Sequence, residues 1–329
     1  MWGFLLYYIQ NSRVEQLRIK EIVKDGGYFL NIGELKNIGL AELIKHNIDN
    51  PSTKINLLLQ YVLEMSKIDL LVNSKNEVTD LKKIEFLGFV QDIIDGKPIQ
   101  YITNNQEFMG LDFYVDKNVL IPQPDTEILV ENVIEKIKKM INMLESKQKI
   151  YVLDLCTGSG AIAVAIENYL EKNNIVKKVK IYASDISKEA LKVARKNDIL
   201  NNEEINITFV LSNLFDNIER KFDIIVSNPP YIEEDIITKL SKEVQNEPHI
   251  ALNGGKDGLD FYRKIAQEAR KYLQEDGYIF LEIGYNQREY VNKIFSEFEE
   301  YRNIECIKDL AGNDRVMKIS FRENNKNID

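Results

Sequence analysis

The chain has 329 residues, which is long enough for a sizeable core and for two domains. Its contents of 44% hydrophobic and 29% charged residues are those of a soluble globular protein, and we expect a cytoplasmic enzyme. The net charge of -9 argues against a protein that works by wrapping the phosphate backbone of nucleic acid, so a protein or small-molecule partner is the better expectation.

Residues 1–31 fit the rest of the chain poorly. They begin with the apolar stretch "MWGFLLYYIQ", which lacks the basic region and the small-residue cleavage site of a signal peptide, and they contain the break Gly26-Gly27. Three interpretations stay open for this segment. The segment could be a disordered extension, it could result from a translation start assigned too far upstream, or it could form one additional helix over "RVEQLRIKEIVK".

Residues 32–97 are expected to form a small helical domain. The stretches "IGELKNIGLAELIKHNI", "TKINLLLQYVLEMSK" and "VTDLKKIEFLGFVQDIID" each place apolar residues at three- and four-residue spacing, which is typical of amphipathic helices. Pro51 interrupts the first two stretches, and Ser52 or Thr53 is the candidate N-cap of the second helix.

Residues 98–123 then change to alternating apolar and aromatic positions around Asn104-Asn105 and Met109-Gly110. This alternation indicates a β-hairpin that links the helical domain to the rest of the chain.

Residues 124–329 alternate strands with helices. Expected strands lie in "KIYVLDL", "KVKIYASDI", "NITFVLSN", "FDIIVSN" and "GYIFLEIG", and expected helices in "AIAVAIENYLEKN", "SKEALKVARKNDIL" and "GLDFYRKIAQEARKYLQ". The alternation predicts an α/β fold with a mostly parallel, doubly wound sheet and right-handed crossovers. No helix separates "NIECIKDL" from "DRVMKISF", so these two strands should pair as an antiparallel hairpin at the edge of the sheet.

Metal, disulfide and membrane chemistry are not expected. The two cysteines, Cys156 and Cys306, cannot build a disulfide framework, and with only His46 and His249 the chain has no cluster at metal-ligand spacing. No apolar run approaches the roughly 20 residues needed to span a bilayer.

A glycine loop follows the first strand of the sheet. Asp154 ends that strand, and Gly158, Ser159 and Gly160 precede a helix. Glycines let the backbone turn sharply and approach a ligand, while the helix N-terminus offers free N–H groups to an anion. The spacing is G-x-G without the third glycine of a dinucleotide fingerprint, so the loop by itself does not identify the ligand.

The next two strand ends carry polar residues that suit a nucleoside. Asp185 is placed to accept both hydroxyls of a ribose, Asn213 to accept from an adenine amino group, and Leu214 or Phe215 to pack on the ring. Taken singly, each has an ordinary structural explanation, such as a helix-cap neighbour for Asp185. Their order at successive strand ends predicts a pocket for S-adenosylmethionine.

The fourth strand ends in Asn228-Pro229-Pro230-Tyr231. The two prolines free the backbone from sheet pairing, so the carbonyl of Pro229 can point into the cleft beside the amide oxygen of Asn228. Such a pair of acceptors fits a planar NH2 group and would orient its nitrogen toward a methyl donor. Tyr231 either walls the pocket with its ring or is an ordinary buried aromatic residue.

These residues resemble the Rossmann-like class I methyltransferases with a seven-stranded sheet. Within that group the chain from about residue 33 onward resembles the protein-(glutamine-N5) methyltransferases of peptide chain release factors, the PrmC or HemK family. The resemblance rests on "LIPQPDTEILVE", "DLCTGSGAIA", "SDIS", "VSNPPYI", "NEPHIALNGGKDGLDFYRKI", "LEIGYNQ" and "DLAGNDRVM".

The resemblance implies methyl transfer from S-adenosylmethionine, giving S-adenosylhomocysteine, to the side-chain amide of the glutamine in the Gly-Gly-Gln loop of bacterial class 1 release factors. The helical domain would help to seat the release factor, and the enzyme would be a monomer that touches neither nucleic acid nor membrane. The implied cofactor contacts are Cys156, Thr157, Gly158, Ser159, Gly160, Asp185, Asn213, Leu214 and Asn228. The implied substrate contacts are Phe108, which would lie over the site, and Asn228, Pro229, Pro230 and Tyr231, among which Asn228, Pro229 and Tyr231 are the catalytic group.

Three positions depart from the family pattern. Gln123 stands where arginine is usual, which weakens any cationic contact from that loop. Cys156 replaces the first glycine of a common Gly-x-Gly-x-Gly loop, and packing is the expected role of its thiol. Asn213 stands where aspartate is frequent, and it keeps an acceptor but not the charge.

Three alternatives remain beside this interpretation. A nucleic acid methyltransferase acting on adenine or guanine amino groups could use the same four residues on a flipped base. A ribosomal protein glutamine methyltransferase would use the same chemistry on another protein. A cofactor-binding protein without catalysis would not need Asn228 to Tyr231.

Overall fold

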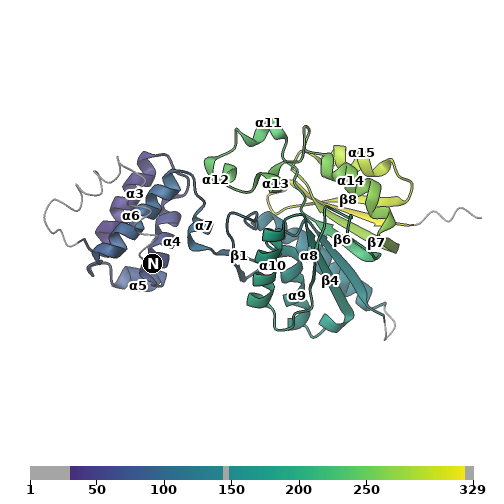
Figure 1. Ribbon diagram of the computed structural model, residues 1–329, viewed down its shortest axis with the longest axis horizontal. Coiled ribbons are helices and arrows are strands. Elements are labelled where there is room, and N and C mark those ends of the chain that lie inside the picture. Colours follow the sequence, from purple (N-terminus) through teal and green to yellow (C-terminus); the bar gives the residue numbers. More distant parts are fainter. Residues whose placement is uncertain (1–29, 144–147, 323–329) are drawn as a thin grey trace, which may run out of the picture. The chain divides into compact units, whose positions relative to one another are not determined.

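The computed structural model describes residues 30–143 and 148–322 and divides into two compact units after Thr103 (Figure 1). The expectations for residues 1–29 lie outside the described residues. Within the described ranges, no helix is both long and apolar enough to cross a bilayer.

The first unit is helical, as the sequence predicts. Its helices are α3 (Ile32–Lys45), α4 (Pro51–Leu63), α5 (Lys67–Val72), α6 (Asp80–Ile94) and α7 (Ile99–Thr103). Helix α3 begins at a capping box, in which the Asn31 side chain accepts from the backbone of Glu34 at 2.9 Å and the Glu34 side chain accepts from the backbone of Asn31 at 2.9 Å. The apolar stripes of α3, α4 and α6 meet in one core that contains Leu35, Ile55 and Phe86.

Two local predictions for this region are wrong. The N-cap of α4 is Asn50, not Ser52 or Thr53, because Pro51 occupies the first helical turn, where its fixed φ is favourable and its missing N–H costs nothing. Residues 99–103 are helical rather than extended, since Ile99 and Ile102, three residues apart, are both buried in the helical core.

A short hairpin opens the second unit. Strands β1 (Gln106–Phe108) and β2 (Leu111–Phe113) pair antiparallel. The two turn residues between them, Met109 and Gly110, have φ values of 55° and 72°, which is the left-handed pattern of a tight hairpin turn.

The sheet of the second unit has the predicted mostly parallel, doubly wound arrangement. Its strands are β3 (Ile150–Leu155), β4 (Val179–Asp185), β5 (Thr208–Leu211), β6 (Phe222–Ser227), β7 (Leu273–Glu282), β8 (Tyr301–Lys308) and β9 (Asp314–Phe321). Their order is β5-β4-β3-β6-β7-β9-β8, and only the pairs β7–β9 and β8–β9 are antiparallel. The chain runs outward from β3 to β5 and then returns to β6 on the other side of β3, which creates the switch point where ligands of such folds bind.

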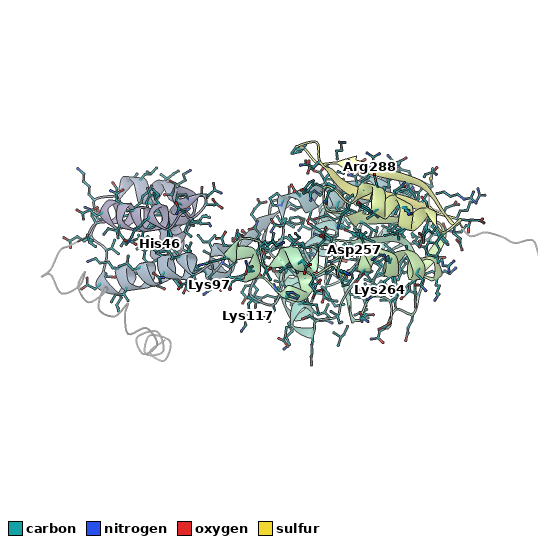
Figure 2. The ribbon with its side chains drawn as sticks, turned by 90° about the horizontal axis from the view of Figure 1, so that it is seen from above. His46, Lys97, Lys117, Asp257, Lys264 and Arg288 are labelled. Carbon is teal, nitrogen blue, oxygen red and sulfur yellow. The ribbon has the colours of Figure 1, made fainter. Side chains whose placement is uncertain are left out.

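Helices cover both faces of this sheet. One face packs against α8 (Glu127–Ile141), α9 (Ala161–Lys172) and α10 (Lys188–Asn201), the other against α14 (Asp260–Glu268) and α15 (Arg288–Ser296) (Figure 1). Successive residues of one strand point to opposite faces, so Val152 joins the first core and Leu153 the second. Charged residues of the outer helices, such as Lys264 and Arg288, are exposed (Figure 2).

The remaining helical segments are short: η1 (Pro124–Thr126), η2 (Val176–Lys178), α11 (Glu234–Ile237), α12 (Lys242–Gln245), α13 (His249–Leu252) and η3 (Ala269–Lys271). Helices α8 and α15 were not among the helices predicted from the sequence. Both are amphipathic, with α8 burying Leu129, Val133 and Ile137 at helical spacing, so their periodicity was available as a signal.

A buried carboxylate on α9 predicts how stability varies with pH. Glu167 is 0% exposed, and burial raises its pKa to about 7, although a side-chain hydrogen bond with Asn206 opposes the rise. A raised pKa means that the folded state holds the proton more tightly, so stability is lost as pH rises from about 4.5 to 7. We expect Glu167→Gln to reduce that loss by roughly 1 to 3 kcal/mol in urea unfolding at pH 5 and pH 8.

Exposed Glu131 on the neighbouring helix α8 provides the matched control. If Glu131→Gln and Glu167→Gln changed the pH dependence equally, burial of Glu167 would not be its cause.

Candidate active site

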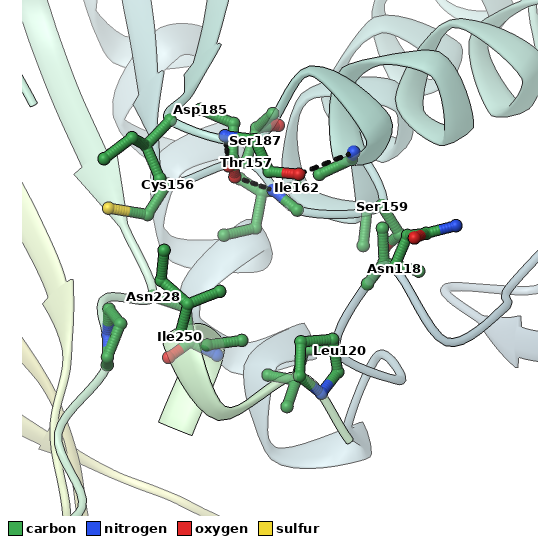
Figure 3. Close-up of a pocket in the computed structure, with 18 of the residues that line it drawn as sticks. Asn118, Leu120, Cys156, Thr157, Ser159, Ile162, Asp185, Ser187, Asn228 and Ile250 are labelled. Atoms are coloured by element: carbon green, nitrogen blue, oxygen red, sulfur yellow. Dashed lines mark hydrogen bonds between the residues drawn. The ribbon is translucent and has the colours of Figure 1, made fainter. Parts of the chain in front are cut away.

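A cavity of about 150 Å³ opens at the carboxyl ends of β3, β4 and β6, next to the loop after β5 (Figure 3). Most of the residues predicted as site residues line it: Cys156, Thr157, Gly158, Ser159, Asp185, Asn213, Leu214, Asn228 and Pro230. Gly160, Pro229, Tyr231 and Phe108 are not among the lining residues. No group of histidine, cysteine and acidic residues within the described ranges could hold a metal ion.

The loop after β3 is held by a buried carboxylate. Asp154 Oδ2 accepts from Thr157 Oγ1 at 2.5 Å and from the backbone N–H of Ala163 at 3.2 Å, which ties the loop to the first turn of α9. Burial raises the pKa of Asp154 to about 7, and these two hydrogen bonds oppose that rise. These hydrogen bonds therefore fix the loop relative to α9.

The two glycines of this loop have different roles. Gly158 has φ +56°, and a Cβ atom added to it would meet no atom within 4 Å, so it leaves open space in the cavity. Gly160 has φ +81°, and a Cβ atom there would lie 3.0 Å from Cβ of Ala194 on α10. Gly160 thus permits close packing of α9 on α10. It was predicted to contact the cofactor, but it does not line the cavity.

Asp185 lines the cavity with part of its acceptor capacity unused (Figure 3). Its carboxylate accepts from the backbone N–H of Gly158 at 2.9 Å through Oδ2 and from that of Ser187 at 2.8 Å through Oδ1. A carboxylate has about four lone-pair sites, and the backbone N–H of Ile186 also bonds to this one, so acceptor capacity remains for a ligand. Burial raises the pKa of Asp185, and the backbone hydrogen bonds oppose the rise.

The loop after β5 supplies an amide and an apolar side chain. Asn213 Nδ2 donates to Asp216 Oδ2 at 3.2 Å, so its amide oxygen is the atom left to accept from a ligand. Leu214 lines the cavity, whereas Phe215 is 1% exposed and stacks on Tyr272 with ring centroids 4.8 Å apart. Of the two candidates for packing on a base, the structure thus brings only Leu214 to the cavity.

Asn228 lies beside Cys156 because β3 and β6 pair in parallel and end at the same level. Leu155 pairs with Ser227, whose hydroxyl donates to the Leu155 carbonyl at 2.5 Å. Asn228 Nδ2 donates to Thr126 Oγ1 at 3.2 Å. Among the described residues, none donates to the Asn228 side-chain oxygen or to the Pro229 carbonyl, and of the two residues Asn228 lines the cavity whereas Pro229 is buried.

The backbone of Tyr231 is held by a hydrogen bond from Gln287 and by close contact with two glycines. Its carbonyl accepts from Gln287 Nε2 at 2.9 Å, and a Cβ atom added to Gly254 or Gly258 would lie 2.7 Å or 2.4 Å from Tyr231 backbone atoms. Only glycine permits this approach. The Tyr231 hydroxyl donates to Glu282 Oε1 at 3.3 Å, and the partly buried residue packs against the core on the α14 side.

Phe108 departs from its prediction. Its ring is 1% exposed and packs edge-on against Phe113, with centroids 5.9 Å apart, in the core beneath α8 and α9. An apolar ring gains most from full burial, so the ring is withdrawn from the cavity.

Sequence reasoning missed two further walls of the cavity. One comes from the loop before η1, including Asn118, Leu120 and Gln123, and the other from the segment around Ile250 (Figure 3). Glu247 joins the two segments, because its Oε2 accepts from the backbone N–H of Ile121 at 2.9 Å. Both walls lie in motifs that carry the family resemblance, but no local pattern assigned them to the cavity.

Cys156 lines the cavity with φ +61°, a conformation that favours glycine. Burial raises the pKa of its thiol, so the thiolate is disfavoured and the side chain packs rather than reacts.

Comparison with known proteins identifies the family. The family model "PrmC N-terminal domain" matches residues 34–103, and "Methyltransferase small domain" matches residues 134–255. A protein named Release factor glutamine methyltransferase from Clostridium acetobutylicum is 44% identical over 79% of this chain and 88% of its own length. Proteins of the same name from Fusobacterium nucleatum and Thermodesulfovibrio yellowstonii are 37% and 41% identical over 86% and 78% of this chain, and 77% and 88% of their own lengths.

The chain belongs to the release factor glutamine methyltransferase family. It is therefore an S-adenosylmethionine-dependent methyltransferase. The cavity fits that cofactor: it is open at Gly158, offers a carboxylate at Asp185 and is apolar at Leu214.

Substitutions of the two loop glycines should have different effects, with Gly158→Ala acting mainly on cofactor binding and Gly160→Ala mainly on stability. Gly158→Ala places a methyl group in the open cavity, and we expect it to weaken S-adenosylmethionine binding at least about 10-fold in calorimetry, with a stability loss of about 1 to 2 kcal/mol from its positive φ. Gly160→Ala adds the contact with Ala194 to the same backbone strain, so it should lower stability further. Equal effects of the two substitutions on binding would contradict this division of roles.

Proposed function

We propose that the enzyme transfers a methyl group from S-adenosylmethionine to the side-chain amide nitrogen of the glutamine in the Gly-Gly-Gln loop of class 1 release factors. The observation that carries the proposal is the side-chain oxygen of Asn228, which lines the cavity at the end of β6 and accepts from no described residue, and we propose that the carbonyl of the adjacent Pro229 acts with it. A primary amide offers two N–H donors in one plane, which is the group that such a pair holds.

The remaining contacts follow from the cavity lining. Cys156, Thr157, Gly158 and Ser159 lie where the methionine part would bind, Asp185 where the ribose hydroxyls would donate, and Asn213 with Leu214 where the adenine would pack. When bound, the cofactor supplies a methyl group already activated by its positively charged sulfur. The chain's part is to hold and orient the acceptor, so no strong general base is required before transfer, and the methylated nitrogen then releases one of its protons to solvent.

An amide nitrogen is a poor nucleophile because its lone pair is delocalised into the carbonyl. Acceptors that hold its hydrogens orient the nitrogen and favour the positive charge that develops on it during transfer. Pro230 lines the cavity and continues the substrate pocket, whereas Tyr231 supports it from behind. We further propose that the helical unit seats the release factor and that the enzyme acts as a cytoplasmic monomer without direct nucleic acid contact.

Removal of one acceptor gives a direct prediction. Asn228→Ala should lower kcat on a release factor by on the order of 10²-fold or more, by analogy with the loss of one oxyanion-hole donor. Calorimetry with S-adenosylmethionine checks that the cofactor still binds. If kcat of the Asn228→Ala variant were normal, Asn228 would not be one of the acceptors that hold the substrate amide.

The acceptor itself can be identified with labelled S-adenosylmethionine. The protein is incubated separately with a class 1 release factor, with the same factor carrying alanine in place of the loop glutamine, with ribosomal proteins and with total nucleic acid. We expect label only in the unaltered factor. Label in nucleic acid or in the alanine-substituted factor would overturn the proposal, and label in a ribosomal protein would favour the related glutamine methyltransferase.

A further inference from the structure

A line of hydrogen bonds connects Asn228 to a buried carboxylate at the end of β7. Asn228 Nδ2 lies 3.2 Å from Thr126 Oγ1, and Thr126 Oγ1 lies 2.6 Å from Glu282 Oε2. The other oxygen of Glu282 accepts from the Tyr231 hydroxyl at 3.3 Å. Thr126 is 4% exposed and Glu282 1%, so water does not compete for these bonds.

The direction of these bonds determines which way the Asn228 amide faces. An ionised carboxylate only accepts, so the single hydroxyl proton of Thr126 points at Glu282. The Thr126 oxygen then has only lone pairs to offer, and Asn228 must present its NH2 group to it. A flipped amide would set oxygen against oxygen and lose a buried hydrogen bond, which costs about 1 to 3 kcal/mol.

We propose that Thr126 and Glu282 are positioning residues that fix the Asn228 amide with its oxygen, rather than its NH2 group, available to the substrate. The proposal rests on the acceptor role of Asn228 proposed above. It assigns a task to two residues that lie within "LIPQPDTEILVE" and "LEIGYNQ" but for which the sequence predicted no role: they select between two amide orientations that have nearly the same shape but opposite hydrogen-bonding character.

Glu282 suits this task because both of its oxygens accept. A glutamine at this position could accept from Thr126 or from Tyr231, but not from both. Burial raises the pKa of Glu282 to about 7, while the Thr126 hydrogen bond and the charge of Arg315 oppose the rise. Arg315 is itself paired with Asp125 at 2.9 Å and Asp309 at 3.2 Å.

Other titratable groups that face Glu282 are Tyr231, whose hydroxyl donates to the carboxylate, and Asp125, whose charge raises the Glu282 pKa; the Tyr262 hydroxyl donates to the Glu282 backbone carbonyl at 3.0 Å. Protonated Glu282 can donate to Thr126, which releases the Thr126 proton toward Asn228 and reverses the line of bonds. Wild-type kcat at saturating cofactor should therefore fall as pH drops through about 7.

A double-mutant cycle tests whether Thr126 acts through Asn228. Thr126→Val keeps the shape and removes the hydroxyl, and we expect kcat to fall by about 10-fold or more while S-adenosylmethionine affinity changes less than about 2-fold. Thr126→Ser retains the hydroxyl and should restore most of the rate. In the Asn228→Ala background, Thr126→Val should cost no more than about 2-fold, because the amide it positions is gone.

Exposed Thr53 in the helical unit is the matched control, since Thr53→Val makes the same chemical change away from the site. An equal loss from Thr126→Val in both backgrounds, or a Thr126→Ser variant as slow as Thr126→Val, would overturn the positioning role. Thermal unfolding of each variant separates loss of fold from loss of rate.

A second readout needs no acceptor protein, so it separates this proposal from the proposed function. In protein with ¹⁵N-labelled asparagine, the Asn228 NH2 resonances are assigned by their loss in Asn228→Ala. They should shift in Thr126→Val and titrate with an apparent pKa near 7 that Glu282→Gln abolishes. If neither substitution changed the Asn228 resonances, the line of hydrogen bonds would be refuted. If the release factor took up no methyl label in the assay described above, only the proposed substrate would be refuted.

Discussion

The active site depends on the parallel pairing of β3 with β6. Because Leu155 and Ser227 are direct neighbours and their strands end together, the cofactor loop and the Asn-Pro-Pro-Tyr segment leave the sheet side by side. Strand pairing is specified by the cores on both faces, since a shift by one residue would turn every side chain to the opposite face. The distance between the two loops is therefore fixed by apolar packing far from the cavity, which explains how a loop-built site can be precise.

Buried carboxylates hold the segments that surround the cavity. Asp154 fixes the loop after β3, Glu247 fastens Ile121, and Glu282 anchors Thr126. Burial raises the pKa of each to about 7, so each carries a desolvation cost at neutral pH. These carboxylates lie around the cavity, so their burial lowers the stability of the protein there while it fixes the positions of the segments that form the site.

The sequence was informative wherever function left a local pattern. Strand ends, the glycine loop, Asp185 and Asn228 could be placed because the carboxyl ends of parallel strands meet at one edge of a sheet. It failed where a residue's role depends on a distant neighbour. Gly160 is small because Ala194 approaches it, and Phe108 is buried because Phe113 packs on it. The loop before η1 and the segment around Ile250 become walls only when the chain folds back.

The sequence by itself determined the fold class and the order of the strand ends that line the cavity, because these depend on residue type, local periodicity and spacing. Only the tertiary structure decided the direction in which the Asn228 amide faces. That direction depends on Thr126 and Glu282, which are 102 residues before and 54 residues after it in the chain. The donor or acceptor character that Asn228 presents depends on contacts with side chains that are distant in the sequence. The segment around Asn228 therefore could not predict the direction of its amide.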